Sequence, residues 1–168
     1  MQDKKVQDAL LVDVQDALTE SSQAPSQTQL TQWANLAYSK VSQAPSEVTI
    51  RLVDVDEITQ LNRDYRSKDK ATNVLSFPFE SDFDLPEELQ GEDDDAFDLL
   101  GDVIICHQVI LDEAKAQSKS VLDHYAHMVV HGILHLCGYD HQDDVEAEEM
   151  EALEVKILAA TNIENPYN

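Results

Sequence analysis

The chain has 168 residues, of which 34 are Asp or Glu and 11 are Lys or Arg, so its formal net charge at pH 7 is −23. This negative charge disfavours nonspecific adhesion to nucleic acid or to an anionic membrane. An apolar content of 42% suits one domain over residues 1–168, and the absence of a signal-like or membrane-spanning stretch predicts a cytoplasmic protein.

Two strand–helix units are predicted in the first half of the chain. Apolar and polar residues alternate weakly over 10–14 and more clearly over 48–52, as in half-buried strands. After each strand, apolar residues recur at helical intervals, which indicates helices with one face in the core. Asp54 or Asp56 can cap the second helix. The apolar positions are Leu30, Trp33 and Ala37 in the first helix, Val48, Ile50 and Leu52 in the second strand, and Ile58, Leu61 and Tyr65 in the second helix.

Five of the eleven cations lie within twenty residues, from the second strand to the turn after the second helix. They are Arg51, Arg63, Arg66, Lys68 and Lys70. We expect most of them to be exposed, because they follow the end of the helix. By charge alone this cluster is typical of a solvated turn, but it is also the one local exception at which an RNA could meet this acidic protein.

The middle of the chain contains two predicted strands separated by an acidic segment. Branched and aromatic residues predict a strand over Val74–Phe79, and Pro78 indicates that it ends there or lies at a sheet edge. Glu80–Asp98 holds ten acidic residues in nineteen, which predicts a long acidic loop within the domain. Gly101–Cys106 then returns to a strand.

Three helices are predicted after the last strand. The first begins near Val109, the second covers Leu122–Cys137 and ends at Gly138, and the third runs from about Asp143 to Ala160. The residues expected on the inner stripe of the last helix are Val145, Met150, Leu153 and Ile157. The element order indicates an α+β domain with a small, mostly four-stranded sheet covered by about five helices.

Three histidines stand at a spacing typical of metal ligands. His131 and His135 are four residues apart, so on a helix their side chains lie about one turn apart and can reach one ion. Gly138 can take a left-handed conformation that ends the helix and turns the chain, so that His141 supplies a third nitrogen. Three ligands leave a position for water, as in catalytic zinc sites that cut phosphodiester or amide bonds.

Other polar residues near this site admit several roles. His127 and His124 share the helical face upstream of the pair, and they can support the ligands, contact substrate or simply pack. Asp140 can orient His141, bind water or cap the turn. Asp143–Asp144 is better placed to cap the last helix.

The histidine and glycine spacing matches the metzincin pattern HExxHxxGxxH, which suggests a metalloprotease. The glutamate that acts as general base in that pattern is replaced by Gly132. The metal geometry is therefore shared, while the proton acceptor for peptide hydrolysis is missing.

Four segments together resemble the YbeY family of metal-dependent endoribonucleases and rRNA maturation factors. They are YRSKDKATNVLSFPFE (65–80), LGDVIIC (100–106), HGILHLCGYDH (131–141) and HQDDVEAEEMEALE (141–154). The resemblance covers the chain from about Val48 onward and, more loosely, the N-terminal third. Ala71 stands where the family often has proline, and the acidic loop is longer than usual.

The resemblance implies which residues form the site. It makes His131, His135 and His141 the ligands of one zinc ion (Zn²⁺), with another transition metal such as nickel (Ni²⁺) as an alternative, and it makes Arg66 the cation of the active-site cleft. A guanidinium can grip a phosphate with two parallel hydrogen bonds and stabilise the charge that builds on its oxygens. Further RNA contacts are predicted for the neighbouring cations Arg63, Lys68 and Lys70.

The resemblance also implies a process. The family acts on single-stranded regions of RNA, in maturation of the 3′ end of 16S rRNA and in ribosome quality control, which implies rRNA and the small ribosomal subunit as partners, with a ribosomal protein or GTPase as a further one. No DNA or membrane partner is expected. The metal would activate water or polarise a phosphate oxygen, with metal hydroxide or Asp140 accepting the proton. A metalloprotease and a noncatalytic ribosome-assembly factor remain as alternatives.

Overall fold

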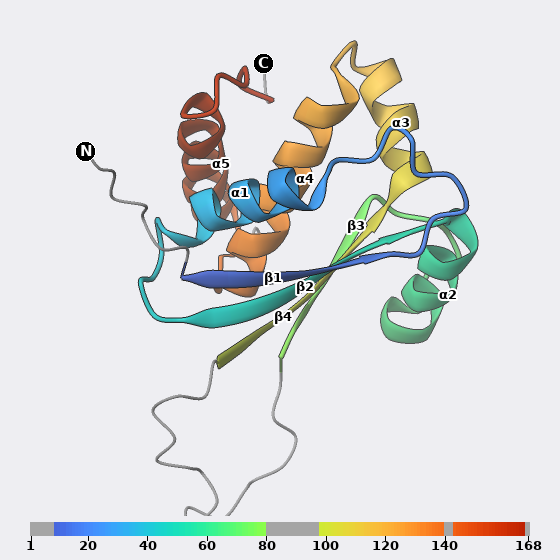
Figure 1. Ribbon diagram of the computed structural model, residues 1–168, viewed down its shortest axis with the longest axis horizontal. Coiled ribbons are helices and arrows are strands. Elements are labelled where there is room, and N and C mark those ends of the chain that lie inside the picture. The colour runs from blue at the N-terminus through green and yellow to red at the C-terminus, as the bar shows by residue number, and fades with distance from the viewer. Residues whose placement is uncertain (1–8, 80–97, 140–142, 167–168) are drawn as a thin grey trace, which may run out of the picture.

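The computed structural model describes residues 9–79, 98–139 and 143–166 (Figure 1). Within these ranges the elements are β1 (Leu10–Asp16), α1 (Gln27–Tyr38), β2 (Ser46–Val53), α2 (Val55–Arg66), β3 (Val74–Pro78), β4 (Asp98–Cys106), α3 (His107–Ala116), α4 (Val121–Leu136) and α5 (Asp144–Ala159). This order confirms the predicted α+β fold. The predicted acidic loop, apart from its last residue, lies outside the described residues. No described helix is long and apolar enough to cross a membrane.

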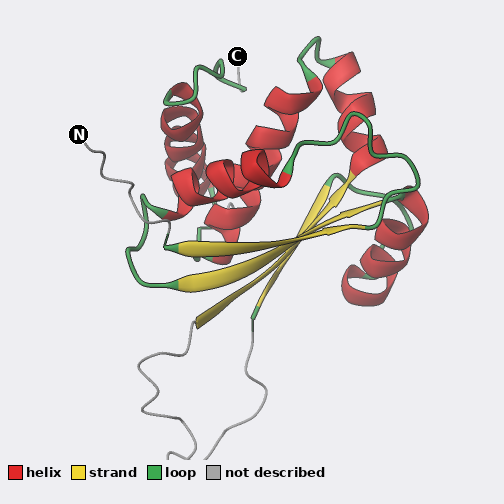
Figure 2. Cartoon of the chain, in the orientation of Figure 1, coloured by secondary structure: helices red, strands yellow, loops and turns green. Residues whose placement is uncertain are grey.

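The four described strands form one mixed sheet in the order β1-β2-β4-β3 (Figure 2). β1, β2 and β4 are parallel, and β3 runs antiparallel to β4. The register places Ile50 between Val14 of β1 and Val103 of β4. β3 is therefore an edge strand that ends at Pro78, as predicted.

Alternation along β4 divides the core between the two faces of the sheet. Val103 and Ile105 belong to the larger cluster, which lies under α1, α4 and α5 on one face. Ile104 and Cys106 belong to a smaller cluster with Ile58 of α2 on the other face. Helices α2 and α4 consequently cover opposite faces of the same sheet.

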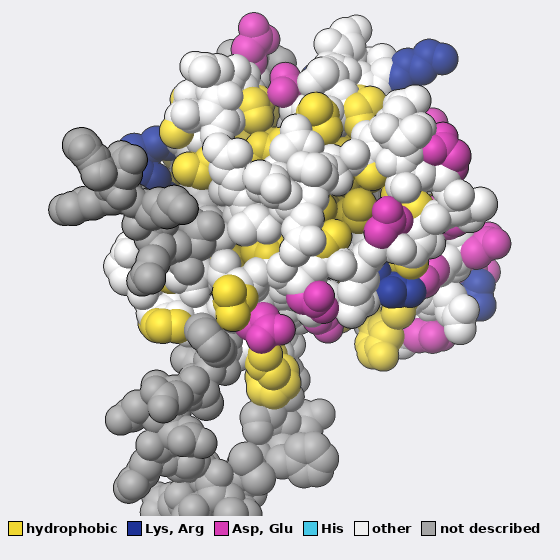
Figure 3. All heavy atoms as spheres, in the orientation of Figure 1, with side chains coloured by type: hydrophobic (Ala, Val, Ile, Leu, Met, Phe, Trp, Pro, Cys, Tyr) yellow, Lys and Arg dark blue, Asp and Glu magenta, His cyan; other side chains and the backbone are white. Residues whose placement is uncertain are grey.

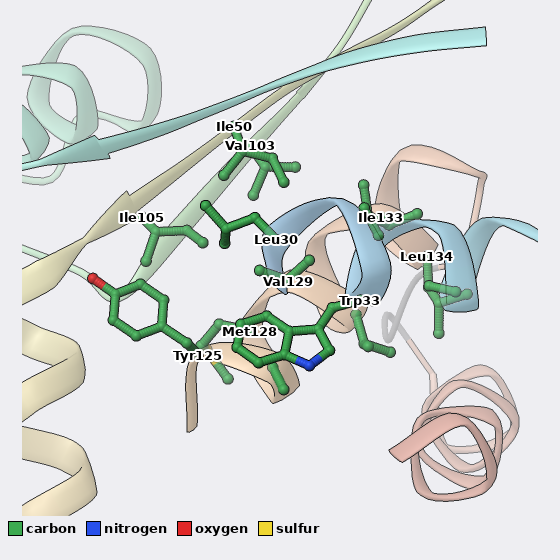
Figure 4. Packing of buried hydrophobic residues seen from close by; sticks show 14 of the residues in the cluster. Leu30, Trp33, Ile50, Val103, Ile105, Tyr125, Met128, Val129, Ile133 and Leu134 are labelled. Carbon is green, nitrogen blue, oxygen red and sulfur yellow. The ribbon is translucent and has the colours of Figure 1, made fainter. Parts of the chain in front are cut away.

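The larger cluster joins α1 and α4 to the strands. Figure 4 shows Ile50 and Val103 pointing from the sheet toward Leu30 of α1 and Val129 of α4. Leu30, Trp33 and Ala37 are all buried, which confirms the predicted inner face of the first helix. Burial of this apolar surface fixes α4, and with it the histidines, on the sheet.

Two residues predicted to face the core do not. Tyr65 is 68% exposed, because it lies at the end of α2, where its ring packs against Phe77 in a T-shaped contact. Val145 is 65% exposed, since it lies about half a turn around α5 from the stripe that packs inward. That stripe consists of Met150, Glu154, Ile157 and Leu158.

Candidate metal centre

The histidines of α4 form one row along the helix. The ring centroids of consecutive histidines are 6.2, 6.4 and 6.3 Å apart. The row runs through His124, His127, His131 and His135. The predicted shared face is therefore correct, and it follows from the three- and four-residue spacing of these side chains.

The predicted ligand pair occupies the end of this row. His131 is half-buried and lies one turn before His135. Gly138 has φ +105°, a left-handed conformation, and its N–H donates to the carbonyl of His135 over 3.1 Å. The chain thus leaves the helix directly after the pair, as expected of a C-terminal glycine.

The remaining predicted members of the centre, Asp140 and His141, lie outside the described residues. The described ranges contain no group of three or more potential metal ligands. They therefore supply two of the three predicted donors, His131 and His135. Both donors are imidazole nitrogens on adjacent turns of a rigid helix, which fits zinc or a similar transition metal.

A carboxylate that was not predicted from the sequence lies beside these histidines. Glu154 of α5 has 0% exposed surface, and its two oxygens contact two rings of the row. Oε1 lies 2.9 Å from Nε2 of His127, and Oε2 lies 2.9 Å from Nδ1 of His131. The sequence signal was a charged residue four positions after Met150, within the apolar stripe of the last helix.

His124, at the start of the row, has a separate partner. Its Nε2 lies 2.8 Å from Oε1 of Glu113 on α3, and the same carboxylate accepts from the side chain of Asn73. Burial lowers the pKa of His124, so the neutral ring is favoured at neutral pH. This pair links α3 to α4 away from the ligand positions.

The start of α5 is capped as predicted. Asp143 accepts a hydrogen bond from the backbone N–H of Glu146.

Gly132, at the position of the metzincin glutamate, faces the sheet. A Cβ atom there would lie 2.9 Å and 3.2 Å from the two methyl groups of Val103 and 3.3 Å from Oγ of Ser76. Such distances leave no room for a longer side chain without displacing β3 or β4. Close packing therefore accounts for the glycine, and this position cannot carry a general base in this fold.

Gly132→Ala is expected to destabilise the protein. Helix propensity alone predicts that alanine adds about 1 kcal/mol of stability, but overpacking against the branched Val103 typically costs about 1–3 kcal/mol. We expect the packing cost to prevail, lowering the free energy of unfolding in urea by up to about 2 kcal/mol. A gain in stability would show that α4 does not approach the sheet this closely.

The cation cluster divides into paired and exposed members. Arg51 donates to both oxygens of Glu57, and Arg63 pairs with Asp69 over 2.9 Å. The other three cations are exposed and form no ion pair with a described residue. They are Arg66, Lys68 and Lys70. On the face seen in Figure 3, Lys and Arg side chains are few and scattered, whereas Asp and Glu side chains are more numerous.

Arg66 and the histidine row approach the same edge strand from opposite faces. Tyr65, next to Arg66, meets Phe77 of β3 with ring centroids 5.1 Å apart. Gly132, next to His131, packs beside Ser76 on the other face of β3. Since neighbouring strand residues point to opposite faces, the end of α2 and the end of α4 flank one short stretch of β3.

The family model and the curated relatives that match this chain carry the same name. The family described as Endoribonuclease YbeY matches residues 12–162. The chain is 49% identical over 162 residues to the endoribonuclease YbeY of Alteromonas mediterranea, covering 94% of this chain and 96% of that one. It is 46% identical over 162 residues to the endoribonuclease YbeY of Colwellia psychrerythraea, covering 95% and 97%. Among solved structures, TM1509 from Thermotoga maritima is similar with a TM-score of 0.57 and 25% identity, covering 88% and 87% of the two chains. The chain therefore belongs to the endoribonuclease YbeY family.

Proposed function

We propose that this protein is a zinc-dependent endoribonuclease that matures the 3′ end of 16S rRNA and takes part in ribosome quality control. The observation that carries the proposal is the pair His131 and His135 on the last turns of α4, in a chain whose relatives are named endoribonucleases. The resemblance of the motif segments to this family supports the rRNA substrate. Zinc is the preferred ion, with nickel as the alternative.

The metal would be held by His131, His135 and His141. A bound zinc ion supplies Lewis acidity to a phosphate oxygen or to water. The protein contributes the rigid placement of the nitrogens, because both described ligands stand on a helix packed against the sheet. Asp140 is our candidate for the proton acceptor, since Gly132 is buried against Val103 and has no side chain to serve.

Arg66 would hold the phosphate next to the scissile bond. Its side chain is exposed at the last position of α2, so it can contact a polyanion directly. Lys68 and Lys70 follow on the same turn and would extend the contact along the RNA backbone. A strand of RNA lying along the β3 edge would meet this turn on one side and the histidines on the other.

A net charge of −23 shapes how such a protein finds its substrate. Repulsion from most of the surface would make binding to free RNA weak and sensitive to salt. A second contact on the small ribosomal subunit, through a ribosomal protein or a GTPase, would raise the effective concentration at the cleavage site. We therefore place the activity on the assembling subunit, in the cytoplasm.

Two alternatives are separated by one experiment. The close packing of Gly132 weighs against a metalloprotease, and an assembly factor with a purely structural metal would bind RNA without cutting it. Purified protein is incubated, with and without a chelator, with structured RNA and with casein. Chelator-sensitive cleavage of RNA alone supports the proposal, whereas cut casein or two intact substrates contradict it.

A further inference from the structure

A fully buried carboxylate on α5 needs a physical explanation. Glu154 has 0% exposed surface within a stripe of Met150, Ile157 and Leu158. Burying a carboxylate is costly unless hydrogen bonds compensate it, and an apolar residue at such a position is often neutral or stabilising. Stability of α5 alone therefore does not account for this residue.

The contacts of Glu154 point to the metal centre. Its two oxygens each lie 2.9 Å from a ring nitrogen of the histidine row, Nε2 of His127 and Nδ1 of His131. A neutral imidazole carries one N–H and one lone pair on its two nitrogens. If the Nδ1–H of His131 donates a hydrogen bond to Glu154, the lone pair is on Nε2, and a metal binds through that lone pair.

His127 completes the arrangement. His127 is 7% exposed and its Nε2 contacts the second oxygen of Glu154, so the carboxylate is held from two successive turns of α4. The same contact joins α4 to α5, the two helices that precede and follow residues 140–142. Glu154 thus contacts the ring of His131 and links the two helices that flank the third predicted ligand in the sequence.

We propose that Glu154 is a positioning residue of the metal centre: it selects the tautomer of His131 that presents Nε2 to the ion, and His127 holds it in place. This inference rests on the proposed metal site at His131 and His135. Supporting carboxylates behind histidine ligands generally orient the ring and raise its basicity. The proposal does not depend on whether RNA is the substrate.

The chain offers a matched control in Glu113 and His124. The contact between Glu113 and His124 is a carboxylate–imidazole hydrogen bond like those of Glu154, with 2.8 Å between Oε1 and Nε2. It also joins a neighbouring helix to the histidine row. His124 is not a predicted ligand and lies upstream of His127 on α4. Removing the Glu113 carboxylate therefore removes a comparable hydrogen bond without touching a ligand.

The experiment compares Glu154→Met, Glu154→Gln and Glu113→Met in the full chain. Zinc affinity is measured by competition with a chelating dye, and the free energy of unfolding of each metal-free protein is measured in urea. We expect Glu154→Met to lower zinc affinity by about 10–100-fold. Glu154→Gln should have a smaller effect, because its amide can still accept from one ring. Glu113→Met should bind zinc like the wild type.

A second measurement needs no variant. Long-range proton–nitrogen NMR correlations in the metal-free wild type report which nitrogen of His131 carries the proton, and we expect Nδ1. A proton on Nε2 would overturn the proposal, as would a Glu154→Met protein that binds zinc as tightly as Glu113→Met. Affinity that merely follows stability across all three variants would assign Glu154 a structural role and also overturn it. A wild-type protein that binds zinc and has its proton on Nδ1 of His131 but leaves RNA uncut would count only against the proposed nuclease function.

Discussion

His135→Ala is expected to lose zinc and RNA cleavage together while the protein remains folded. The substitution removes one of three predicted ligands, and a four-coordinate zinc site in a peptide is worth roughly 10–16 kcal/mol, or about 3 kcal/mol per ligand. Apparent zinc affinity should therefore fall by at least about 100-fold. Alanine is the best helix former, and His135 is only half-buried, so α4 should persist.

The measurement combines zinc content after dialysis, cleavage of a fluorescent RNA and helical content by circular dichroism. His124→Gln is the matched control, because it alters a histidine of the same row whose partner is Glu113 rather than a predicted ligand. We expect that control to retain zinc. A His135→Ala protein with a full complement of zinc would remove this residue from the site.

Arg66→Glu is expected to retain zinc and lose RNA cleavage. Arg66 is exposed at the end of α2, so reversing its charge costs the helix only about 0.3–1 kcal/mol through the helix dipole. Loss of a group that stabilises developing charge typically lowers the rate by 10²–10³-fold, and we expect a decrease of at least about 100-fold. Arg66→Lys should be intermediate, since it keeps the charge but not the bidentate geometry.

The control for charge is Lys40→Glu, which makes the same change in an exposed turn after α1. Cleavage rates at several salt concentrations separate a local phosphate contact from general repulsion, because only general repulsion would affect both variants alike. Undiminished rRNA processing by Arg66→Glu would exclude the phosphate role.

The type and order of the elements were predictable because they depend on local periodicity. The strands at 10–14 and 48–52 and the helix at 122–137 were predicted to within a few residues of their observed bounds. The position of β4 between β2 and β3 was not predicted, since alternation identifies the inner residues of a strand but not its neighbours. Val145 was misplaced because its helix was assigned an inner stripe from apolar residues alone.

The distinction between local sequence pattern and long-range packing also applies to the site. His131 and His135 are neighbours on one helix, so their spacing in the sequence determines their proximity. Glu154 is 23 residues from His131, and only the packing of α5 on α4 brings them together. The relation of Arg66 to the histidines likewise depends on β3 lying between α2 and α4, which no local pattern indicates.

The contact between α4 and α5 also sets an order of events during synthesis. His131 and His135 leave the ribosome before Glu154, which follows His131 by 23 residues. A nascent chain that has exposed the histidines but not α5 therefore lacks the carboxylate that orients one of them. On the proposed role of Glu154, full metal affinity would be reached only after this late helix docks, so a partly made chain would be a poor nuclease beside the rRNA of the ribosome that makes it.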